Sequence, residues 1–549
     1  MPQRSAAVAA HSRLHPAAFA AEVGFHPNAA YLAEVAEYGC DTGFTAGTRV
    51  RFCDNHPSAY EHSAIIDADV ALGLQNGHVI DVTDLYYAEA SMGCIVSPLI
   101  VVFHPRTLKP RVVTDATCYA GSCTNDSCDP TNLPHTRLHS PADLADTIVS
   151  MQTAQPHNPV LLQNYDLRRA YKSVPVRAED WWTMAFAWRG RVYWWVVSPF
   201  GHRTSSNALC AATDILTGHL RRVHGVVSHP YVDDLGTAMY ASDAVRADAA
   251  VKSVVPLFGF DMELKKLDEA GPPSDEKDWV GFHFQARARL ISVPTAKLQQ
   301  VCATIVGVLA AGSASPRDGH SLWSQLLFIS RAVPALAPFT VALRQWVQDN
   351  GGTRMRSTAP LSPTAREDLE FWLGAINGHN GVCMLPATVV PPTATVRTDS
   401  CTTGYGGLVI ETTRYLYGYW LAAGEPPAGW HINFKEAATA LALVRDAVAS
   451  GHSNIHVVCD NTAAVAAFNR MRSISPDLLP IVRALAQLAL AGVSVSASYI
   501  NTLQNTLPDT MSRHNLELLF LLYPQAVAIS LPPSWASHLR QSPRHFATQ

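Results

Sequence analysis

Residues His229–Gly236 read HPYVDDLG and place two adjacent carboxylates, Asp233 and Asp234, between two apolar runs. The pattern predicts two strands joined by a tight turn. Upstream, Val160–Tyr171 reads VLLQNYDLRRAY, a predicted apolar strand that reaches Asp166. One carboxylate on a strand and a pair on a hairpin could together bind two Mg²⁺ ions, because hard cations prefer oxygen ligands. Mn²⁺ accepts the same ligands and stays an alternative.

An Asp-Asp pair alone is most often part of a turn or a helix cap, so its sequence context matters. Five segments in order resemble the palm motifs of reverse transcriptases, particularly those of retrotransposons. These segments are Asp166–Tyr171 (motif A), Ser198–Ser205 (SPFGHRTS, motif B), Tyr231–Asp234 (motif C), Gly259–Phe260 with Lys265–Lys266 (motif D) and Trp279–Phe282 (motif E). The resemblance implies RNA-directed DNA synthesis in which Asp166, Asp233 and Asp234 bind the metal ions.

The resemblance also implies which residues contact the incoming dNTP. They are Arg111, Leu167, Tyr171 and Gly201. Arg111 lies in Lys109–Asp115 (KPRVVTD), which resembles the fingers strand whose basic residue meets the triphosphate. Lys109 and Arg106 are weaker candidates for the same role. Solvated charges on an ordinary strand are the alternative interpretation of these side chains.

Tyr171 matches the bulky residue beneath the sugar, where its ring would exclude a ribose 2′-hydroxyl and favour dNTP over rNTP. An ordinary aromatic core residue is the alternative. Lys266 is the better match for the lysine proposed to protonate pyrophosphate, with Lys265 next to it. Phe200 stands where retroviral enzymes have glutamine, and Gly201 after it would let the backbone approach the template and the nucleotide closely.

Four acidic residues in the last third of the chain lie in an informative order of predicted elements. They are Asp399 at the end of a short strand, Glu436 on a helix, Asp460 at the end of an apolar strand and Asp509 on a last helix. Each alone is a weak signal, because an Asp before a helix is a common cap, but together they resemble the acids of ribonuclease H. The resemblance implies metal-assisted hydrolysis of the RNA strand of an RNA/DNA hybrid. Tyr499 and Thr502 stand where related nucleases often carry a His-x-x-Gly loop, which predicts intact or reduced activity.

The length of 549 residues exceeds what one hydrophobic core holds. The patterns predict an α+β multidomain fold with right-hand-like fingers and palm, a helical thumb or connection, and an α/β ribonuclease H-like domain. The predicted boundaries are 1–85 for an N-terminal extension without an assigned role, 86–300 for fingers and palm, 301–385 for the thumb or connection, 386–395 for a Pro/Thr-rich linker, 396–520 for the nuclease and 521–549 for a tail. Helical spacing from Leu322 to Val333 supports the connection. Ser362–Pro363 is typical of an N-cap and a first helical residue, opening a helix through Trp372.

The net charge of −4 argues against a protein that binds nucleic acid with its whole surface. Residues 161–226, however, contain nine basic and four acidic side chains, which suits a groove along phosphates as well as a solvated face. Cys118, Cys123 and Cys128 are spaced too widely for a usual zinc knuckle, so reduced thiols are the simpler interpretation. No run of about 18 apolar residues occurs, and no signal peptide is evident. These features predict a cytoplasmic or nuclear protein.

The expected partners are an RNA or DNA template-primer, an RNA/DNA hybrid and dNTPs, with no membrane. A domesticated or decayed remnant that binds nucleic acid without catalysis is the alternative, but it would tolerate loss of the acids. An RNA-dependent RNA polymerase would be expected to have a small or polar residue at Tyr171. A structural coat-like protein explains none of the motifs. Ile432–Asn433 and Asp460–Thr462 most resemble DIRS-like and Ty3-like retrotransposon polyproteins.

Overall fold

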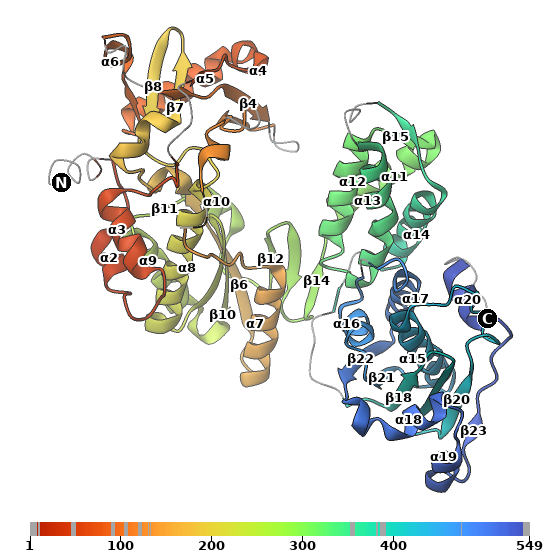
Figure 1. The fold of residues 1–549 in the computed structure, drawn as a ribbon. Coiled ribbons are helices and arrows are strands. Elements are labelled where there is room, and N and C mark those ends of the chain that lie inside the picture. The colour runs from red at the N-terminus through yellow and green to blue at the C-terminus, as the bar shows by residue number, and fades with distance from the viewer. Residues whose placement is uncertain are drawn as a thin grey trace. The chain divides into compact units, whose positions relative to one another are not determined.

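The chain forms two compact units, Met1–Arg289 and Leu290–Gln549 (Figure 1). This computed structural model describes residue 8 and residues 11–45, 51–88, 94–103, 108–118, 123–129, 131, 133–351, 357–379, 383–384, 391–473 and 475–541. Each unit mixes helices with sheets and has a hydrophobic core of its own, in agreement with the predicted α+β class. Among the described residues, no helix combines the length and the apolar character that a membrane crossing needs.

The central sheet of the first unit carries the Asp-Asp hairpin. Its strands, in spatial order, are β11 (Asp261–Met262), β6 (Val160–Arg168), β10 (Asp234–Tyr240) and β9 (Val227–Tyr231). Neighbouring strands run antiparallel throughout. Tyr165 and Leu167 of β6 are buried in one core with α8 (Ser205–His224) and α9 (Ala244–Leu257), which lie beside the sheet in Figure 1.

Two further elements complete the surroundings of this sheet. Helix α7 (Pro141–Ala154) opens at a capping box formed by Ser140. The hairpin of β12 (Glu276–Trp279) and β13 (Phe282–Gln285) places Trp279 on the sheet. A Cβ atom added to Gly236 would lie 2.6 Å from the Trp279 ring, so glycine is needed in β10 for this close packing.

The segment predicted as an N-terminal extension belongs to two different parts of the first unit. Helices α2 (Pro16–Ala20) and α3 (Ala29–Tyr38) bury Phe19, Leu32 and Val35 in the same core as α8. Residues 51–88 contribute instead to a second sheet. The described part of residues 1–85 is therefore integral to the fold of this unit.

The second sheet contains, in spatial order, β1 (Arg51–Phe52), β3 (Ile95–Val96), β7 (Ala185–Trp188), β8 (Arg191–Trp195) and β2 (Val79–Asp81). Its core contains Trp181, Phe186 and Trp195, packed with α5 (Ser63–Gln75). The remaining described elements here are α4 (Pro57–Glu61), α6 (Thr83–Ala88), η4 (Ala178–Met184) and the hairpin of β4 (Leu99–Phe103) with β5 (Pro110–Thr114). Strands β1 and β2 precede residue 86, so this sheet draws on residues outside the range 86–300 that was predicted for fingers and palm.

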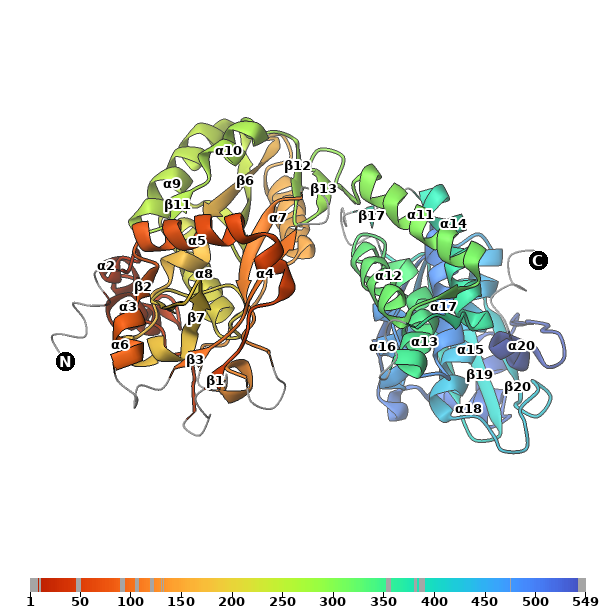
Figure 2. The same ribbon diagram turned by 90° about the horizontal axis from the view of Figure 1, so that it is seen from above.

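The second unit begins with a helical bundle (Figure 2). Its helices are α11 (Thr295–Ala311), α12 (Pro316–Ile329), α13 (Val341–Gly351) and α14 (Pro363–His379), joined by η6 (Pro334–Thr340) and the short strand pairs β14 (Leu290–Ser292) with β17 (Cys383–Met384) and β15 (Ser313–Ala314) with β16 (Ala359–Pro360). The helical pattern predicted from sequence is confirmed. The Ser362 hydroxyl accepts a hydrogen bond from the Ala365 N–H at 3.2 Å, and α14 continues past Trp372.

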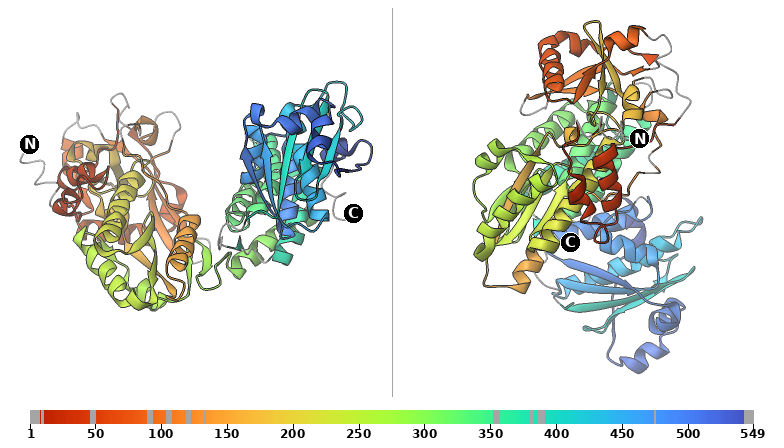
Figure 3. Two further views of the ribbon diagram at one scale, coloured as in Figure 1. Left: turned by 90° about the horizontal axis from the view of Figure 1, so that it is seen from below. Right: turned by 90° about the vertical axis from the view of Figure 1, so that its left-hand side faces the viewer.

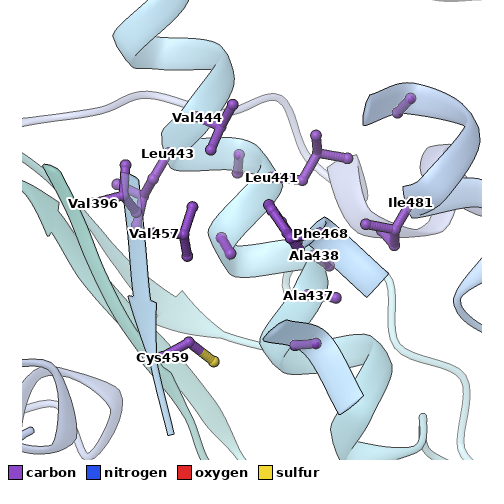
Figure 4. Packing of buried hydrophobic residues seen from close by; sticks show 14 of the residues in the cluster. Val396, Ala437, Ala438, Leu441, Leu443, Val444, Val457, Cys459, Phe468 and Ile481 are labelled. Atoms are coloured by element: carbon purple, nitrogen blue, oxygen red, sulfur yellow. The ribbon is translucent and has the colours of Figure 1, made fainter. Parts of the chain in front are cut away.

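The rest of the second unit is built on a six-stranded sheet (Figure 3). Its strands, in spatial order, are β22 (Ser494–Tyr499), β21 (Asn454–Cys459), β18 (Ala394–Ser400), β19 (Gly404–Val409), β20 (Arg414–Tyr419) and β23 (Val527–Ala528). The helices are α15 (Ile432–Ala449), α16 (Thr462–Arg470), α17 (Leu479–Leu490), α18 (Thr506–Ser512), α19 (Glu517–Leu522) and α20 (Trp535–Gln541). Figure 4 shows Val396 and Val457 of the sheet packed beside Leu443 of α15.

The boundaries of this part differ from the predicted ones at both ends. Residues 386–390 of the predicted linker lie outside the described residues, whereas Ala394 and Thr395 already belong to β18. Residues 521–541, predicted as a tail, include β23 and α20. Trp535 of α20 is buried and donates a hydrogen bond from Nε1 to the Tyr405 hydroxyl at 3.3 Å. The fold therefore continues beyond residue 520, because apolar side chains of α20 complete the core.

Candidate functional site

The Asp-Asp hairpin closes through a strained two-residue loop. Tyr231 pairs with Asp234, which leaves Val232 and Asp233 as the loop. Val232 has φ +61°, the left-handed value that a type II′ turn needs at its first loop position and that glycine adopts most easily. A β-branched residue in this conformation costs about 1–3 kcal/mol. The sheet pairing on both sides of β10 holds the loop in place.

The sheet register brings the three predicted acids of the first unit together. Asp234 is the direct partner of Asp166, and the Leu167 N–H donates to the Asp233 carbonyl oxygen at 2.8 Å. Burial raises the pKa of Asp234 to about 7, and the charges of Asp166 and Asp233 add to the rise. Burial and the charge of Asp166 also raise the pKa of Asp233. Crowded, partly buried carboxylates of this kind favour a bound cation.

Lys266 supplies positive charge to this centre. It lies on α10 (Leu264–Ala270), and its ammonium donates to Oδ2 of Asp166. Burial opposes its protonation, but the hydrogen bond to Asp166 and the nearby carboxylates raise the pKa of Lys266. Lys265 instead faces solvent and lies 4.0 Å from Glu269. The structure thus distinguishes the two lysines that the sequence left as neighbours.

Tyr171 and Gly201 lie on neighbouring segments. Tyr171, in η3 (Ala170–Ser173), has its ring centroid 5.0 Å from that of Phe200. Burial raises the pKa of Tyr171 to about 12, helped by Cys210 and Asp233. Gly201 has φ +102°, and an added Cβ would lie 2.0 Å from the Thr114 carbonyl oxygen. No other residue fits there without a shift of β5.

The other predicted nucleotide contacts divide into three cases. Arg111 is exposed on β5, and its charge opposes the rise in the pKa of Asp233. Lys109 is exposed on the same segment, and Arg106 lies outside the described residues. The side chain of Leu167 is buried in the core, and its N–H donates to the Asp233 carbonyl oxygen. Leu167 therefore offers a nucleotide no free side chain.

Asn125 is a site residue that the sequence analysis missed. Its Nδ2 donates to the Gly201 carbonyl oxygen at 2.9 Å, and its Oδ1 accepts from the Arg203 N–H at 2.8 Å. The side chain therefore clamps the loop on both sides of His202. One asparagine in a loop rich in Asn and Asp carries no sequence signal for such a role. Within the described residues, the nearby Cys118, Cys123 and Cys128 form no converging metal-ligand group.

Three of the four acids predicted in the second unit converge at one end of its sheet. Asp399 lies on β18, Asp460 directly follows the parallel neighbour β21, and Glu436 lies on α15. Burial raises the pKa of Asp399 to about 6, and the charges of Asp460 and Asp509 add to this rise. Burial likewise raises the pKa of Glu436 well above its ordinary value, with Asp399 and Asp460 contributing. This centre has the same charge crowding as the first.

Each of these acids accepts at least one hydrogen bond, and Glu436 also accepts one from the Cys459 thiol at Oε2. The Ser512 hydroxyl donates to Asp399 Oδ2 at 2.6 Å, and the Ser400 N–H donates to Glu436 Oε1 at 3.0 Å. The Thr502 hydroxyl donates to Asp460 Oδ2 at 2.7 Å. Ligand atoms of Glu436, Cys459 and Asp460 lie within 4.8 Å of one another. The oxygen donors fit a hard divalent cation, and neither the Cys459 thiol nor the serine and threonine donors were anticipated from sequence.

Asp509 approaches this centre on α18. Its carboxylate pairs with Arg513 one helical turn later, at 2.8 Å. The helix packs directly on β19, since a Cβ atom on Gly406 would lie 2.5 Å from that of Met511. Tyr499, predicted to stand in the place of a histidine loop, is exposed. All four predicted acids therefore lie on the predicted element types.

No protein-family model matches the chain, and no curated protein does. Among solved structures, a foamy viral protease-reverse transcriptase in complex with RNA/DNA hybrid matches with 14% identity over 83% of this chain and 56% of its own, at a TM-score of 0.47. The corresponding complex with double-stranded DNA matches with 16% identity over 84% of this chain and 87% of its own, at a TM-score of 0.46. Both TM-scores lie below 0.5, so these matches carry no argument about function.

Proposed function

We propose that the chain is an RNA-directed DNA polymerase with ribonuclease H activity towards RNA/DNA hybrids, derived from a DIRS-like or Ty3-like retrotransposon. The observation that carries the proposal is the register that pairs Asp234 with Asp166 and leaves Asp233 in the adjoining turn. Raised pKa values for Asp233 and Asp234 make this arrangement costly without a cation. A remnant that only binds nucleic acid would not need three carboxylates crowded together in this way.

At the polymerase centre, Asp166, Asp233 and Asp234 would hold Mg²⁺ or Mn²⁺ through carboxylate oxygens. Bound cations supply the charge that lowers the pKa of a primer 3′-hydroxyl and neutralises the triphosphate. Arg111 would bind the triphosphate as a charged hydrogen-bond donor. Lys266 holds a proton beside Asp166 and would give it to the departing pyrophosphate.

The sugar of the incoming nucleotide would lie against Tyr171. Its ring, packed beside Phe200, excludes a 2′-hydroxyl by steric conflict. The backbone at Gly201 can approach the nucleotide because no side chain intervenes. The product would therefore be DNA. In this assignment residues 86–300 supply the fingers and palm and residues 301–385 supply the thumb or connection.

The nuclease centre, within residues 396–520, would use Asp399, Glu436, Asp460 and Asp509. Cations held there supply an activated water for hydrolysis of a phosphodiester. Thr502 keeps Asp460 oriented, as its 2.7 Å hydrogen bond indicates. An A-form hybrid would be bound mainly through phosphates and 2′-hydroxyls, so its affinity should fall with salt.

The test is primer extension on poly(rA)/oligo(dT) with dTTP and Mg²⁺. Wild type is compared with Asp233→Asn plus Asp234→Asn, and with Asp399→Asn plus Glu436→Gln. The first double variant should lose DNA synthesis and keep hybrid cleavage, and the second should show the reverse. A folded wild type that makes no product with Mg²⁺ or Mn²⁺ would contradict the polymerase proposal and favour a remnant without catalysis.

A further inference from the structure

A chain of partly buried polar side chains connects the N-terminal segment to the Asp-Asp hairpin. We call it the histidine relay, and it consists of His26, His139, His229, Asp214 and Thr147. His229 lies on β9, Thr147 on α7 and Asp214 on α8. His26 lies between α2 and α3, and His139 precedes α7. Side chains from five separate segments of the chain are therefore connected to the strand that leads into the hairpin.

Every link of the relay is at hydrogen-bond distance. Thr147 Oγ1 lies 2.8 Å from His229 Nε2, and His229 Nδ1 lies 2.9 Å from His139 Nδ1. His139 Nε2 lies 3.4 Å from Asp214 Oδ1, and His26 Nε2 lies 3.2 Å from Asp214 Oδ2. Hydrogen bonds in a partly dry interior fix geometry more strongly than those in water.

The partners determine the direction of each hydrogen bond. The Asn28 N–H donates to His26 Nδ1 at 3.2 Å, so the proton of neutral His26 is on Nε2 and points to Asp214. The carboxylate of Asp214 accepts only, so His139 must also donate from Nε2. His139 Nδ1 is then an acceptor, and His229 must donate to it. Thr147 completes the chain as the donor to His229.

The surrounding charges agree with this assignment. Burial, together with the charges of His139 and Arg221, lowers the pKa of His229 to about 4, which keeps the ring neutral. Burial would raise the pKa of Asp214, but the hydrogen bonds from His139 and His26 hold it below its ordinary value. Two other charges affect the pKa of His229 in opposite directions: Asp143 raises it and Arg137 lowers it. A single pattern of tautomers therefore satisfies the whole relay.

We propose that the histidine relay positions the catalytic hairpin, with His139 and His229 as its positioning residues, and that it makes residues 11–45 a working part of the polymerase. His229 is three residues before Val232, the first residue of the strained loop. Sheet pairing fixes β9 along one edge only, since β9 is the last strand of its sheet. The hydrogen bonds of the histidine relay fix β9 on its other side. This inference rests on the proposed polymerase function.

Two variants distinguish the relay from a simple charge effect. His139→Phe keeps a ring but leaves the His229 N–H and one Asp214 oxygen without partners. Asp214→Asn removes the charge, yet its amide can donate to His139 Nε2, and the tautomers of His139 and His229 then reverse so that every link persists. Glu22→Gln is the matched control. Glu22 also joins the N-terminal segment to α8, through His219 at 2.6 Å, but it has no link to β9.

The experiment measures hydrogen–deuterium exchange in residues 227–240 together with primer extension. His139→Phe should raise amide exchange in the hairpin about 10-fold and lower kcat about 10-fold, as expected when a partly buried hydrogen bond is lost. The KM for dTTP should stay unchanged. Asp214→Asn and Glu22→Gln should leave both near wild type. A folded His139→Phe with unchanged exchange, or an Asp214→Asn variant as impaired as His139→Phe, would overturn the proposal.

Two outcomes, an unfolded variant and an inactive wild type, call for a further measurement. If His139→Phe does not fold, Thr147→Val removes only the terminal hydroxyl and should raise exchange in residues 227–240, and no change there would overturn the relay. If wild type makes no DNA, the polymerase proposal fails. The exchange data still decide whether the relay holds the hairpin, because they need no activity.

Discussion

At the scale of single residues, Tyr171 should decide which sugar is used. Tyr171→Val removes the ring that lies 5.0 Å from Phe200 and opens space for a 2′-hydroxyl. We expect the preference for dTTP over UTP to fall by about 10- to 100-fold, the range that steric exclusion of a small group supports. The measurement is kcat/KM for each nucleotide in primer extension. Tyr171→Phe keeps the ring and should keep the preference; its loss in that variant would contradict a steric gate.

Asp399 gives a prediction about pH. Its pKa rises from 3.8 in the unfolded chain to about 6 in the fold, chiefly through burial. Between these values the folded protein binds more protons than the unfolded chain, so stability from this group falls as pH rises and is lowest above about pH 6. Without metal at about pH 7.5, Asp399→Asn should therefore raise the free energy of unfolding by about 1–3 kcal/mol.

The same variant at about pH 2.5, below the unfolded pKa of 3.8, is the internal control for this prediction. There the wild-type carboxyl is largely protonated in both states, so the substitution should change Tm little. Added Mg²⁺ should raise the Tm of wild type more than that of Asp399→Asn. An equal Tm gain for the variant at both pH values would show that the carboxyl charge is not the cause.

At the scale of elements, the packing of α18 on β19 should control the nuclease. An added Cβ at Gly406 would lie 2.5 Å from the Cβ of Met511 and 2.6 Å from the Ser512 nitrogen. These are backbone-fixed atoms, so Gly406→Ala should displace α18 with Asp509 and cost about 1–3 kcal/mol. We expect hybrid cleavage to be lost while primer extension continues.

Gly374 on α14 provides the control for the α18 prediction. Nothing lies within 4 Å of a Cβ added there, so Gly374→Ala should stabilise its helix by about 0.5–1 kcal/mol and leave cleavage intact. Cleavage assays of both variants, with their Tm values, check the prediction. Normal cleavage by Gly406→Ala would mean that α18 is not held by this contact.

At the scale of the whole molecule, a buried ion pair joins the two parts of the second unit. Arg483 of α17 lies 2.7 Å from Asp368 of α14, whose side chain is 1% exposed. Burial raises the pKa of Asp368 to about 6, opposed by Arg483. Asp368→Ala leaves the guanidinium buried without its partner and should cost about 3–5 kcal/mol. The bundle and the nuclease sheet should then unfold together at a lower temperature.

Calorimetry and hybrid cleavage across the transition check this coupling. Glu370→Ala, on the same helix, should change stability by about 1 kcal/mol or less, because the pair of Glu370 with Arg366 is exposed. Asp368→Leu with Arg483→Met should recover much of the loss, since an apolar pair needs no compensating charge. Loss of the bundle without loss of cleavage would contradict a shared unit.

The sequence by itself determined the order of elements and the acids they carry. Alternating apolar residues placed Asp166 on a strand, and helical spacing placed Glu436 on a helix, because local side-chain period follows backbone geometry. The observed secondary structure therefore agrees with the predicted one at each of these acids. The preference for Lys266 over Lys265 stays a prediction, and the hydrogen bond from Lys266 to Asp166 is consistent with it.

Only the tertiary structure decided which side chains meet. Several hydrogen bonds join residues that are far apart in the chain: Asn125 with Gly201, Thr502 with Asp460, and His139 with its partners in the histidine relay. No local sequence pattern encodes such contacts. The buried side chain of Leu167 and the core position of Trp535 likewise depend on what packs opposite them. The spacing of apolar residues indicates whether a segment is a helix or a strand and which of its faces is apolar. The burial of a side chain and its hydrogen-bond partners are set by other segments of the fold.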